Sequence, residues 1–295
     1  TQVLIMSQKI YQIDAFADTL FSGNPAAVCP LENWLDADIM QKIAAENNLA
    51  ETAFTVRVEN GYEIRWFTPE VEVDLCGHAT IATFKLLLLK GRIATGVYKQ
   101  ETLAGILSVE ALADGSILME QSIPEYYEII EPSEIAKSLG LLVSELSEDY
   151  PVQVVSTGLK DIMVPVKSLE ALKNIEPDFE AITDISKKYE STGYHVFTTE
   201  SLSGADCACR NFAPLYDIDE EAATGTASGA LSSYLFKYKV LKDKTYNRLA
   251  FEQGYYMNSP SRIIASLHVT DDEITGVYVG GNAIVTGEID IKRGI

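Results

Sequence analysis

Hydrophobic and polar positions along the chain follow two periods. Segments 9–17 and 51–58 alternate apolar and polar residues, which predicts half-buried strands. Segment 35–48 places its apolar residues three and four positions apart, which predicts an amphipathic helix. We expect further strands where apolar runs end at turn residues, as in the hairpin with Asp-Gly at its turn in GILSVEALADGSILMEQS.

Two other segments consist almost entirely of apolar or small residues. HATIATFKLLLLKG and TGTASGALSSYLFKYKV have helical length but no polar face, so each predicts a helix buried on every side. Strands and helices mix without regular βαβ alternation. The pattern therefore favours an α+β fold with largely antiparallel sheets.

The segments around these two helices form an internal repeat. R-x-F-x-P begins at Arg65 and again at Arg210. C-G-H-A-T at 76–80 and T-G-T-A-S at 224–228 then follow, each at the start of a buried helix. The repeat predicts two similar lobes, each a sheet around one buried helix. We expect lobes at 1–125, completed by the last strand at 283–295, and at 126–282, with the acidic, proline-containing segment 123–134 as a linker.

Composition excludes several functions. The 295 residues carry 23 Lys and Arg against 43 Asp and Glu, a net charge of −20. That argues against nucleic acid and anionic membranes as partners. There is no 18-residue apolar run for a membrane span, and TQVLIM lacks the basic region of a signal peptide, so we expect the cytoplasm.

The cysteines indicate neither disulfides nor a metal. Four in a chain of this length do not make a disulfide framework. Cys207 and Cys209 are too close for a zinc knuckle and face the same side of a strand, which favours the core. We expect no metal site.

The starts of the two buried helices indicate anion binding. Helices beginning near Gly77 and Gly225 present free backbone N–H groups and positive dipole ends. If the lobes are related by symmetry, both starts can converge on one carboxylate or phosphate. The alternative is that both glycines serve only tight turns.

An ordered set of motifs resembles the PhzF family of phenazine-biosynthesis-like isomerases. The motifs are Y-Q-I-D-A-F, S-G-N-P-A-A-V, N-N-L-A-E-T-A-F, F-T-P-x-x-E-V-x-L-C-G-H-A-T and E-E-A-A-T-G-T-A-S-G, and the resemblance runs from residue 9 to the C-terminus. It implies the diaminopimelate epimerase-like fold: two lobes, each a barrel-like sheet around a central helix, with the active site between them.

The resemblance also implies an acid/base isomerase that needs no cofactor. The glutamate that moves the proton in the family corresponds to Glu51, and the histidine of the G-H motif to His78. Glu221 stands where the family usually has aspartate, and Thr226 where serine is common. The first change keeps the carboxylate but lengthens its reach by one methylene, and the second keeps a hydroxyl.

The candidate residues have alternative interpretations. A buried Glu51 would have a raised pKa suited to proton transfer, whereas a solvated one would be a simple strand-end charge. His78 either assists proton transfer or makes a local hydrogen bond at the helix start. A thiolate is conceivable for Cys76 at a helix N-terminus, but Cys76 aligns with Thr224 in the repeat, so a two-thiol racemase mechanism fails.

The sequence thus predicts a small-molecule isomerase acting on a carboxylate-bearing metabolite. We expect a homodimer, both from the resemblance and because homodimers are the commonest oligomers. The alternatives are a racemase or epimerase of a small acid and a catalytically silent binding protein. The predicted catalytic residues are Glu51, His78 and Glu221. The predicted substrate-binding residues are Asn24, Cys76, Gly77, Ala79, Thr224, Gly225 and Thr226.

Overall fold

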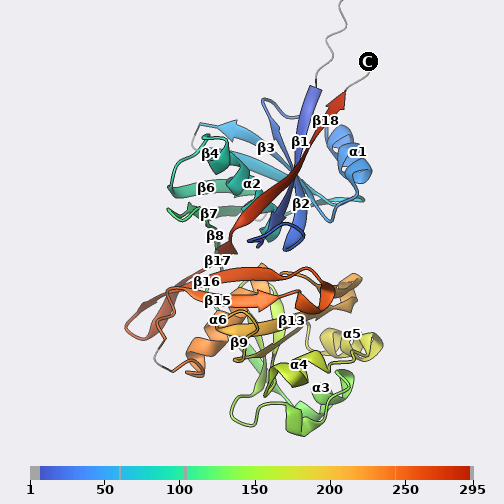
Figure 1. Ribbon diagram of the computed structural model, residues 1–295, viewed down its shortest axis with the longest axis vertical. Coiled ribbons are helices and arrows are strands. Elements are labelled where there is room, and N and C mark those ends of the chain that lie inside the picture. The colour runs from blue at the N-terminus through green and yellow to red at the C-terminus, as the bar shows by residue number, and fades with distance from the viewer. Residues whose placement is uncertain (1–6, 60, 103–104, 243, 293–295) are drawn as a thin grey trace, which may run out of the picture. The chain divides into compact units, whose positions relative to one another are not determined.

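The computed structural model describes residues 7–292 apart from 60, 103–104 and 243, so the TQVLIM segment lies outside the described residues. The chain divides into two compact units. The first comprises Thr1–Met119 and Gly280–Ile295, and the second Glu120–Val279. Figure 1 shows the first and last strands, β1 and β18, side by side in the first unit.

The first unit is a curved sheet with one helix inside it. Its strands lie in the order β18-β1-β2-β3-β4-β6-β7-β8, and among the described residues only β2–β3 and β4–β6 are parallel pairs. The short β5 pairs with β4. The bounds are β1 (Ser7–Ala15), β2 (Asn24–Leu31), α1 (Ala37–Asn47), β3 (Thr52–Val58), β4 (Gly61–Phe67), β5 (Glu72–Val73), α2 (Gly77–Leu89), β6 (Gly96–Thr102), β7 (Gly105–Ala111), β8 (Ile117–Gln121) and β18 (Ala283–Lys292).

The second unit repeats this arrangement. Its strands lie in the order β9-β10-β11-β12-β13-β15-β16, with parallel pairs only at β11–β12 and β13–β15. The short β14 pairs with β13, as β5 does with β4. The bounds are β9 (Glu125–Ile130), α3 (Pro132–Ser138), β10 (Val152–Ser156), β11 (Lys160–Pro165), α4 (Leu169–Lys173), α5 (Phe179–Lys188), β12 (Gly193–Thr198), β13 (Cys207–Ala213), β14 (Ile218–Glu221), α6 (Gly225–Lys237), β15 (Leu249–Gln253), β16 (Ser261–Thr270) and β17 (Glu273–Gly281). Three short 3-10 helices lie at Val143–Glu145, Pro214–Tyr216 and Tyr255–Met257.

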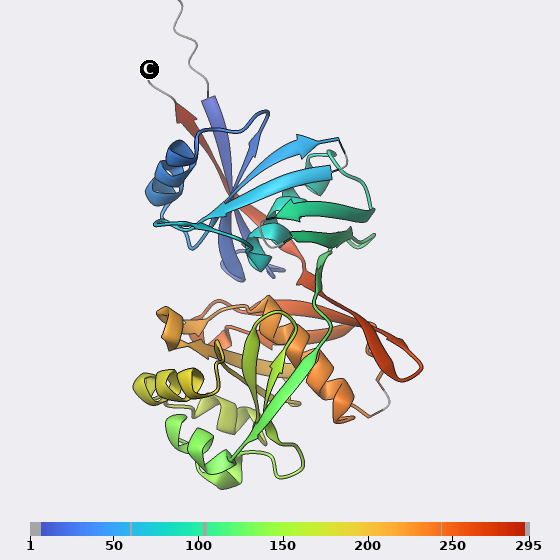
Figure 2. The ribbon, with the colours of Figure 1, turned by 180° about the vertical axis from the view of Figure 1, so that it is seen from behind.

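The two long apolar segments are the buried helices that the sequence predicts. α2 buries every residue from Ala79 to Leu87, and α6 every residue from Ala227 to Leu235. Both helices pack against strands of their own unit. The amphipathic helices cover the other face of each sheet, α1 over β1–β4 and α3–α5 over β10–β13. Figure 2 shows α2 and α6 from behind, each against its sheet.

The shared strand order explains the repeat. In each unit the R-x-F-x-P segment ends the strand that carries the short edge strand, and the buried helix follows it. The prediction of an α+β fold with two similar lobes around buried helices is confirmed.

The prediction of a linker at segment 123–134 is wrong, because this segment forms β9, pairs with β10 and then continues into α3. Tyr126 pairs with Val155 and Ile130 with Val152 of β10, so the residues between the acids form a strand. In the described part of the chain, no helix combines the length and apolar character needed to cross a membrane.

Candidate functional site

Three side chains from two segments of the first unit form a compact cluster. Glu51 lies directly before β3, while Cys76 and His78 lie at the start of α2. The His78 Nε2 atom is 3.1 Å from Glu51 Oε2, and His78 Nδ1 is 3.5 Å from Cys76 Sγ. The ligating atoms of all three residues lie within 4.8 Å of one another. The sequence reasoning named all three residues, and the fold brings them together.

The backbone around the cluster is fixed by neighbouring bonds. Cys76 is the N-cap of α2 in an extended conformation, and its carbonyl accepts hydrogen bonds from the N–H (3.1 Å) and the hydroxyl (2.7 Å) of Thr80. The Glu51 carbonyl accepts the N–H of Ala27 on β2, 3.0 Å away. Gly77 and His78 occupy the first turn of α2, where backbone N–H groups have no intrahelical acceptor.

The pKa of Glu51 lies below its ordinary value, which corrects the expectation of a raised pKa. Burial raises this pKa, but the close contact and charge of His78, together with the Cys76 thiol, lower it by more. The side chain is only 20% exposed, so the histidine contact acts with little screening by water. Glu51 is therefore a carboxylate at neutral pH.

The pKa of His78 moves in the opposite direction. Burial lowers it, but the neighbouring Cys76 and the Glu51 carboxylate raise it well above 6.5. Burial raises the pKa of Cys76, so the thiolate considered for this helix start is not the neutral-pH form. The cluster therefore combines a carboxylate base, an imidazolium acid and a neutral thiol.

The contact between Glu51 and His78 is close but not a complete hydrogen bond. Glu51 Oε2 and His78 Nε2 are both buried, and neither has a hydrogen-bond partner of good geometry among the described residues. Their 3.1 Å separation is an ion-pair distance. Both atoms retain capacity for a further partner.

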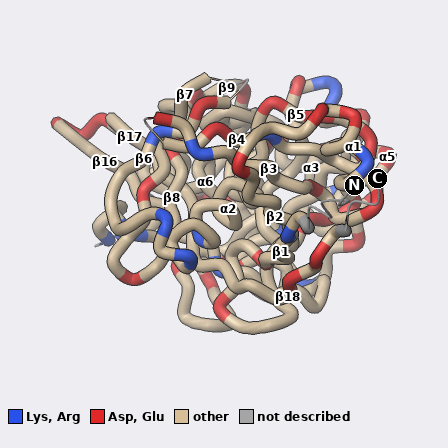
Figure 3. Tube along the Cα trace, turned by 90° about the horizontal axis from the view of Figure 1, so that it is seen from above, with Lys and Arg blue, Asp and Glu red and all other residues tan. Residues whose placement is uncertain are grey.

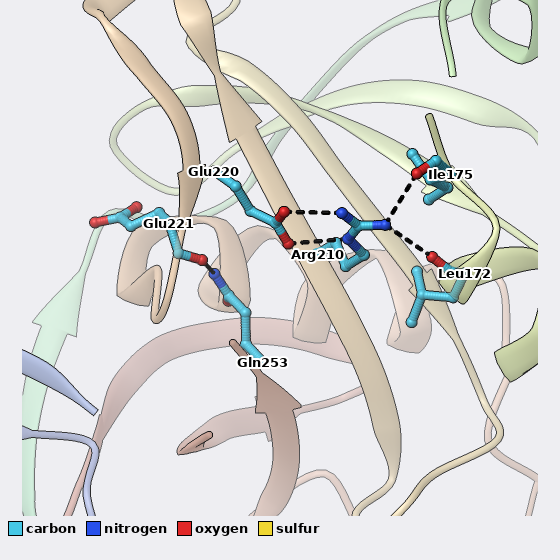
Figure 4. A network of polar contacts seen from close by, with 6 residues as sticks. All are labelled: Leu172, Ile175, Arg210, Glu220, Glu221 and Gln253. Atoms are coloured by element: carbon cyan, nitrogen blue, oxygen red, sulfur yellow. Dashed lines mark hydrogen bonds and ion pairs between the residues drawn. The ribbon is translucent and has the colours of Figure 1, made fainter. Parts of the chain in front are cut away.

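The second unit carries the matching helix start. Glu221 ends β14, and its carboxylate accepts a 2.6 Å hydrogen bond from the hydroxyl of Thr224, the N-cap of α6. Gln253 at the end of β15 donates to the Glu221 carbonyl at 2.7 Å and to the Thr224 hydroxyl at 3.0 Å, and its Oε1 accepts the Thr224 N–H at 3.2 Å. Figure 4 shows Gln253 beneath Glu221. The sequence reasoning missed Gln253, because no local motif marks a side chain contributed by a distant strand.

A paired arginine and glutamate hold the strand that leads to each helix start. In the second unit, Arg210 makes two hydrogen bonds to the Glu220 carboxylate, at 2.9 and 2.8 Å (Figure 4). Its remaining nitrogen donates to the carbonyls of Leu172 and Ile175. The guanidinium also lies over the ring of Phe212.

The first unit repeats this pairing. Arg65 makes two 2.6 Å hydrogen bonds to Glu72 on β5 and lies over Phe67. Both arginines open an R-x-F-x-P segment, and both glutamates belong to the short edge strand. The repeat therefore preserves a bidentate clamp just before each helix start.

The other predicted binding residues have simpler surroundings. Gly77, Gly225 and Thr226 lie partly exposed in the first turns of their helices, whereas Ala79 is fully buried. Asn24 begins β2, buried opposite Ala15 of β1.

Two buried titratable groups of the second unit were not singled out as site residues. Asp161 on β11 is 1% exposed, and burial together with Glu221 raises its pKa to about 8. His195 on β12 was expected to be structural. Its Nδ1 lies 3.0 Å from Asn211 Oδ1, and burial lowers its pKa to about 4. Acidic positions outnumber basic ones along the trace in Figure 3, in keeping with the net charge of −20.

Known proteins resemble the chain along its whole length. The model of the phenazine biosynthesis-like protein family, PhzC-PhzF, matches residues 13–288. The chain belongs to this family. An uncharacterized isomerase from Clostridium acetobutylicum is 34% identical over 96% of this chain and 97% of its own length.

Solved structures agree with this assignment. A Bacillus anthracis phenazine biosynthesis protein of the PhzF family superposes with a TM-score of 0.85 at 29% identity, covering 97% of this chain and 99% of that one. A hydroxyproline epimerase from Agrobacterium vitis superposes with a TM-score of 0.59 over 97% of this chain and 91% of that one. At 11% identity, that likeness concerns the fold alone. The predictions of PhzF membership, an epimerase-like fold and an isomerase-type enzyme are confirmed.

Proposed function

We propose that this PhzF-family protein is an acid/base isomerase of a small carboxylate-bearing metabolite, with Glu51 as the proton-transfer group and no cofactor in the proton transfer. The observation that carries the proposal is the 3.1 Å contact between Glu51 and His78, whose pKa values are displaced in opposite directions. A base and an acid held side by side at one pH suit proton transfer at carbon.

The proposed reaction moves one proton within the substrate. The Glu51 carboxylate takes a proton from carbon, and the electron pair of that C–H bond delocalises toward an adjacent unsaturated or carbonyl group. The His78 imidazolium stabilises the negative charge as it develops. The protonated Glu51, whose hydrogen exchanges with solvent, then delivers a proton to another carbon, so the double bond shifts and the enzyme regains its starting state.

First-turn N–H groups of α2 support binding of the substrate carboxylate. Gly77 and His78 donate no intrahelical bond there, and the helix dipole adds a partial positive charge. The corresponding groups of the second unit are Gly225 and Thr226, with Glu221 as a further acid/base or orienting group. Their participation is proposed from the family resemblance and from the repeat.

Positional isomerisation is distinguished from epimerisation by where solvent hydrogen enters the substrate. We propose incubating the enzyme in deuterium oxide with a panel of small cyclic and unsaturated carboxylic acids, followed by NMR of the recovered acids. Deuterium at a new carbon with a shifted double bond supports the proposal. Deuterium at the original carbon with inversion supports the racemase or epimerase alternative.

Glu51→Gln tests the assigned base, with Glu46→Gln as the matched control, because Glu46 is an exposed glutamate on α1. We expect exchange to fall at least about a hundredfold in E51Q and to stay unchanged in E46Q. Full exchange in E51Q contradicts the assignment. Binding of an acid without exchange at any carbon supports the silent binding protein. The homodimer and the cytoplasmic location stay predictions.

A further inference from the structure

We propose that Glu51, Cys76 and His78 also form a binding site for a thiophilic divalent cation such as Zn²⁺. In the second part of the proposal, which rests on the proposed function, a bound cation inhibits the enzyme by occupying Glu51. The sequence predicts no metal site, and these three residues, which come from two separated segments, form no metal-binding motif in it. The only close cysteine pair in the sequence, Cys207 and Cys209, is buried in β13.

The sulfur and nitrogen atoms already have the separation that a tetrahedral metal imposes. Zinc binds thiolate sulfur at about 2.3 Å and imidazole nitrogen at about 2.0 Å, so at the tetrahedral angle these two ligands lie about 3.5 Å apart. Cys76 Sγ and His78 Nδ1 are 3.5 Å apart. This separation therefore suits a cation bound by both atoms in place of their present contact.

A carboxylate oxygen of Glu51 supplies the third ligand. The donor atoms of the three residues lie within 4.8 Å of one another, so a side-chain rotation of Glu51 brings an oxygen into reach. Glu51 Oε2 is buried and lacks a hydrogen bond of good geometry, which leaves it free to accept a cation. Water can complete a tetrahedral set.

The charges of this ligand set balance. A thiolate and a carboxylate together offset a divalent cation, so the complex is neutral in a site where an isolated charge is costly. Among the ligands of zinc, thiolate, imidazole and carboxylate are the usual three. Binding displaces the thiol proton and requires the neutral form of His78.

Cobalt(II) is the probe that tests the site, because thiolate ligation gives a near-ultraviolet charge-transfer absorption. We expect the full-length, tag-free protein to bind one Co²⁺ per chain with that absorption, and Zn²⁺ to displace it. Cys76→Ser is expected to abolish the absorption, while the matched control Cys207→Ser, which changes another buried cysteine, retains it. Absence of the absorption in the unchanged protein, or its full retention in C76S, overturns the proposal.

A second measurement needs no substitution. The unchanged protein is treated with iodoacetamide with and without Zn²⁺, and the modified cysteines are mapped by mass spectrometry. Protection of Cys76 by at least about tenfold is expected, and equal alkylation overturns the site. Inhibition of solvent exchange by Zn²⁺ tests the second part separately. If E51Q proves fully active, the acid/base assignment fails while the cobalt result still decides whether the cation site exists.

Discussion

Glu51 Oε2 and His78 Nε2 lie 3.1 Å apart, so the carboxylate and the imidazole share one contact within the first unit. Each group changes the proton affinity of the other. The carboxylate holds a proton on the imidazole, and the imidazolium keeps the carboxylate ionised. The pair can therefore be studied without a substrate, through the titration of its histidine.

The first prediction concerns that titration. The chain has three histidines, at positions 78, 195 and 268. We expect the His78 imidazole to titrate above pH 6.5 and His195 near pH 4. Glu51→Gln should lower the midpoint of His78, because it removes the carboxylate and leaves the burial in place. Proton–carbon NMR measures the midpoints, and a His78 midpoint at or below 6.5 contradicts the assignment.

The second prediction concerns the pH dependence of kcat/KM once a substrate is known. Glu51 is ionised above its pKa, which lies below 4.5, and His78 is protonated below its pKa, which lies above 6.5. Activity should therefore be flat between those limits, falling at lower pH as Glu51 gains a proton and at higher pH as His78 loses one.

The variant His78→Gln tests whether the alkaline limb of the kcat/KM profile belongs to His78 and the acid limb to Glu51. We expect the alkaline limb to vanish and the acid limb to move upward, because burial, the largest effect on the pKa of Glu51, is then opposed only by the Cys76 thiol. The rate should fall about a hundredfold. Retention of the alkaline limb in H78Q would assign it to another group.

The third prediction compares the two arginine clamps. Arg210 and Glu220 are 9% and 15% exposed, whereas Arg65 and Glu72 are 27% and 25% exposed. Because lysine cannot replace the bidentate geometry, R210K should lower the free energy of unfolding by about 2 kcal/mol and R65K by less than about 1 kcal/mol. Urea unfolding measures both values. Equal losses would show that burial does not set the strength of these pairs.

The fourth prediction concerns Asp161. Its pKa rises from 3.8 in an ordinary environment to about 8 here, so the folded protein binds the proton more tightly than the unfolded chain. Stability contributed by this group is present below about pH 4 and is lost as the pH rises through 8. Asp161→Asn cannot ionise and should stabilise the protein by roughly 2–4 kcal/mol at pH 8, with little gain at pH 4. Urea unfolding at the two pH values measures the difference, and an equal gain at both would attribute it to packing.

The repeat and the residues at each helix start can be predicted from the sequence because both depend on local signals, whereas Glu51 is assigned through the family resemblance. The buried helices have no polar face, and the residues at each helix start stand next to a glycine. Gln253, Arg65 and Arg210 could not be assigned roles in this way. Their partners lie on other strands, and a strand's pairing depends on the whole fold rather than on its own residues.

Segment 123–134 was wrongly predicted to be a linker for a different reason. Its acids and prolines outweigh the alternating apolar positions of β9, so composition favours a linker. The direction of the pKa shift of Glu51 could not be predicted from the sequence for another reason. Burial can be anticipated from an apolar neighbourhood, but the neighbour that reverses the shift, His78, is 27 positions further along the chain.

The pairing of β1 with β18 has a consequence during protein synthesis. Residues 7–15 find their antiparallel partner in residues 283–292, which are synthesised after the whole of the second unit. The second unit, by contrast, is continuous in the chain and can acquire all its strands earlier. We therefore expect β1 to stay unpaired along one edge until residues 283–292 have been synthesised, so that a nascent chain exposes this edge to chaperones for longer than any edge of the second unit.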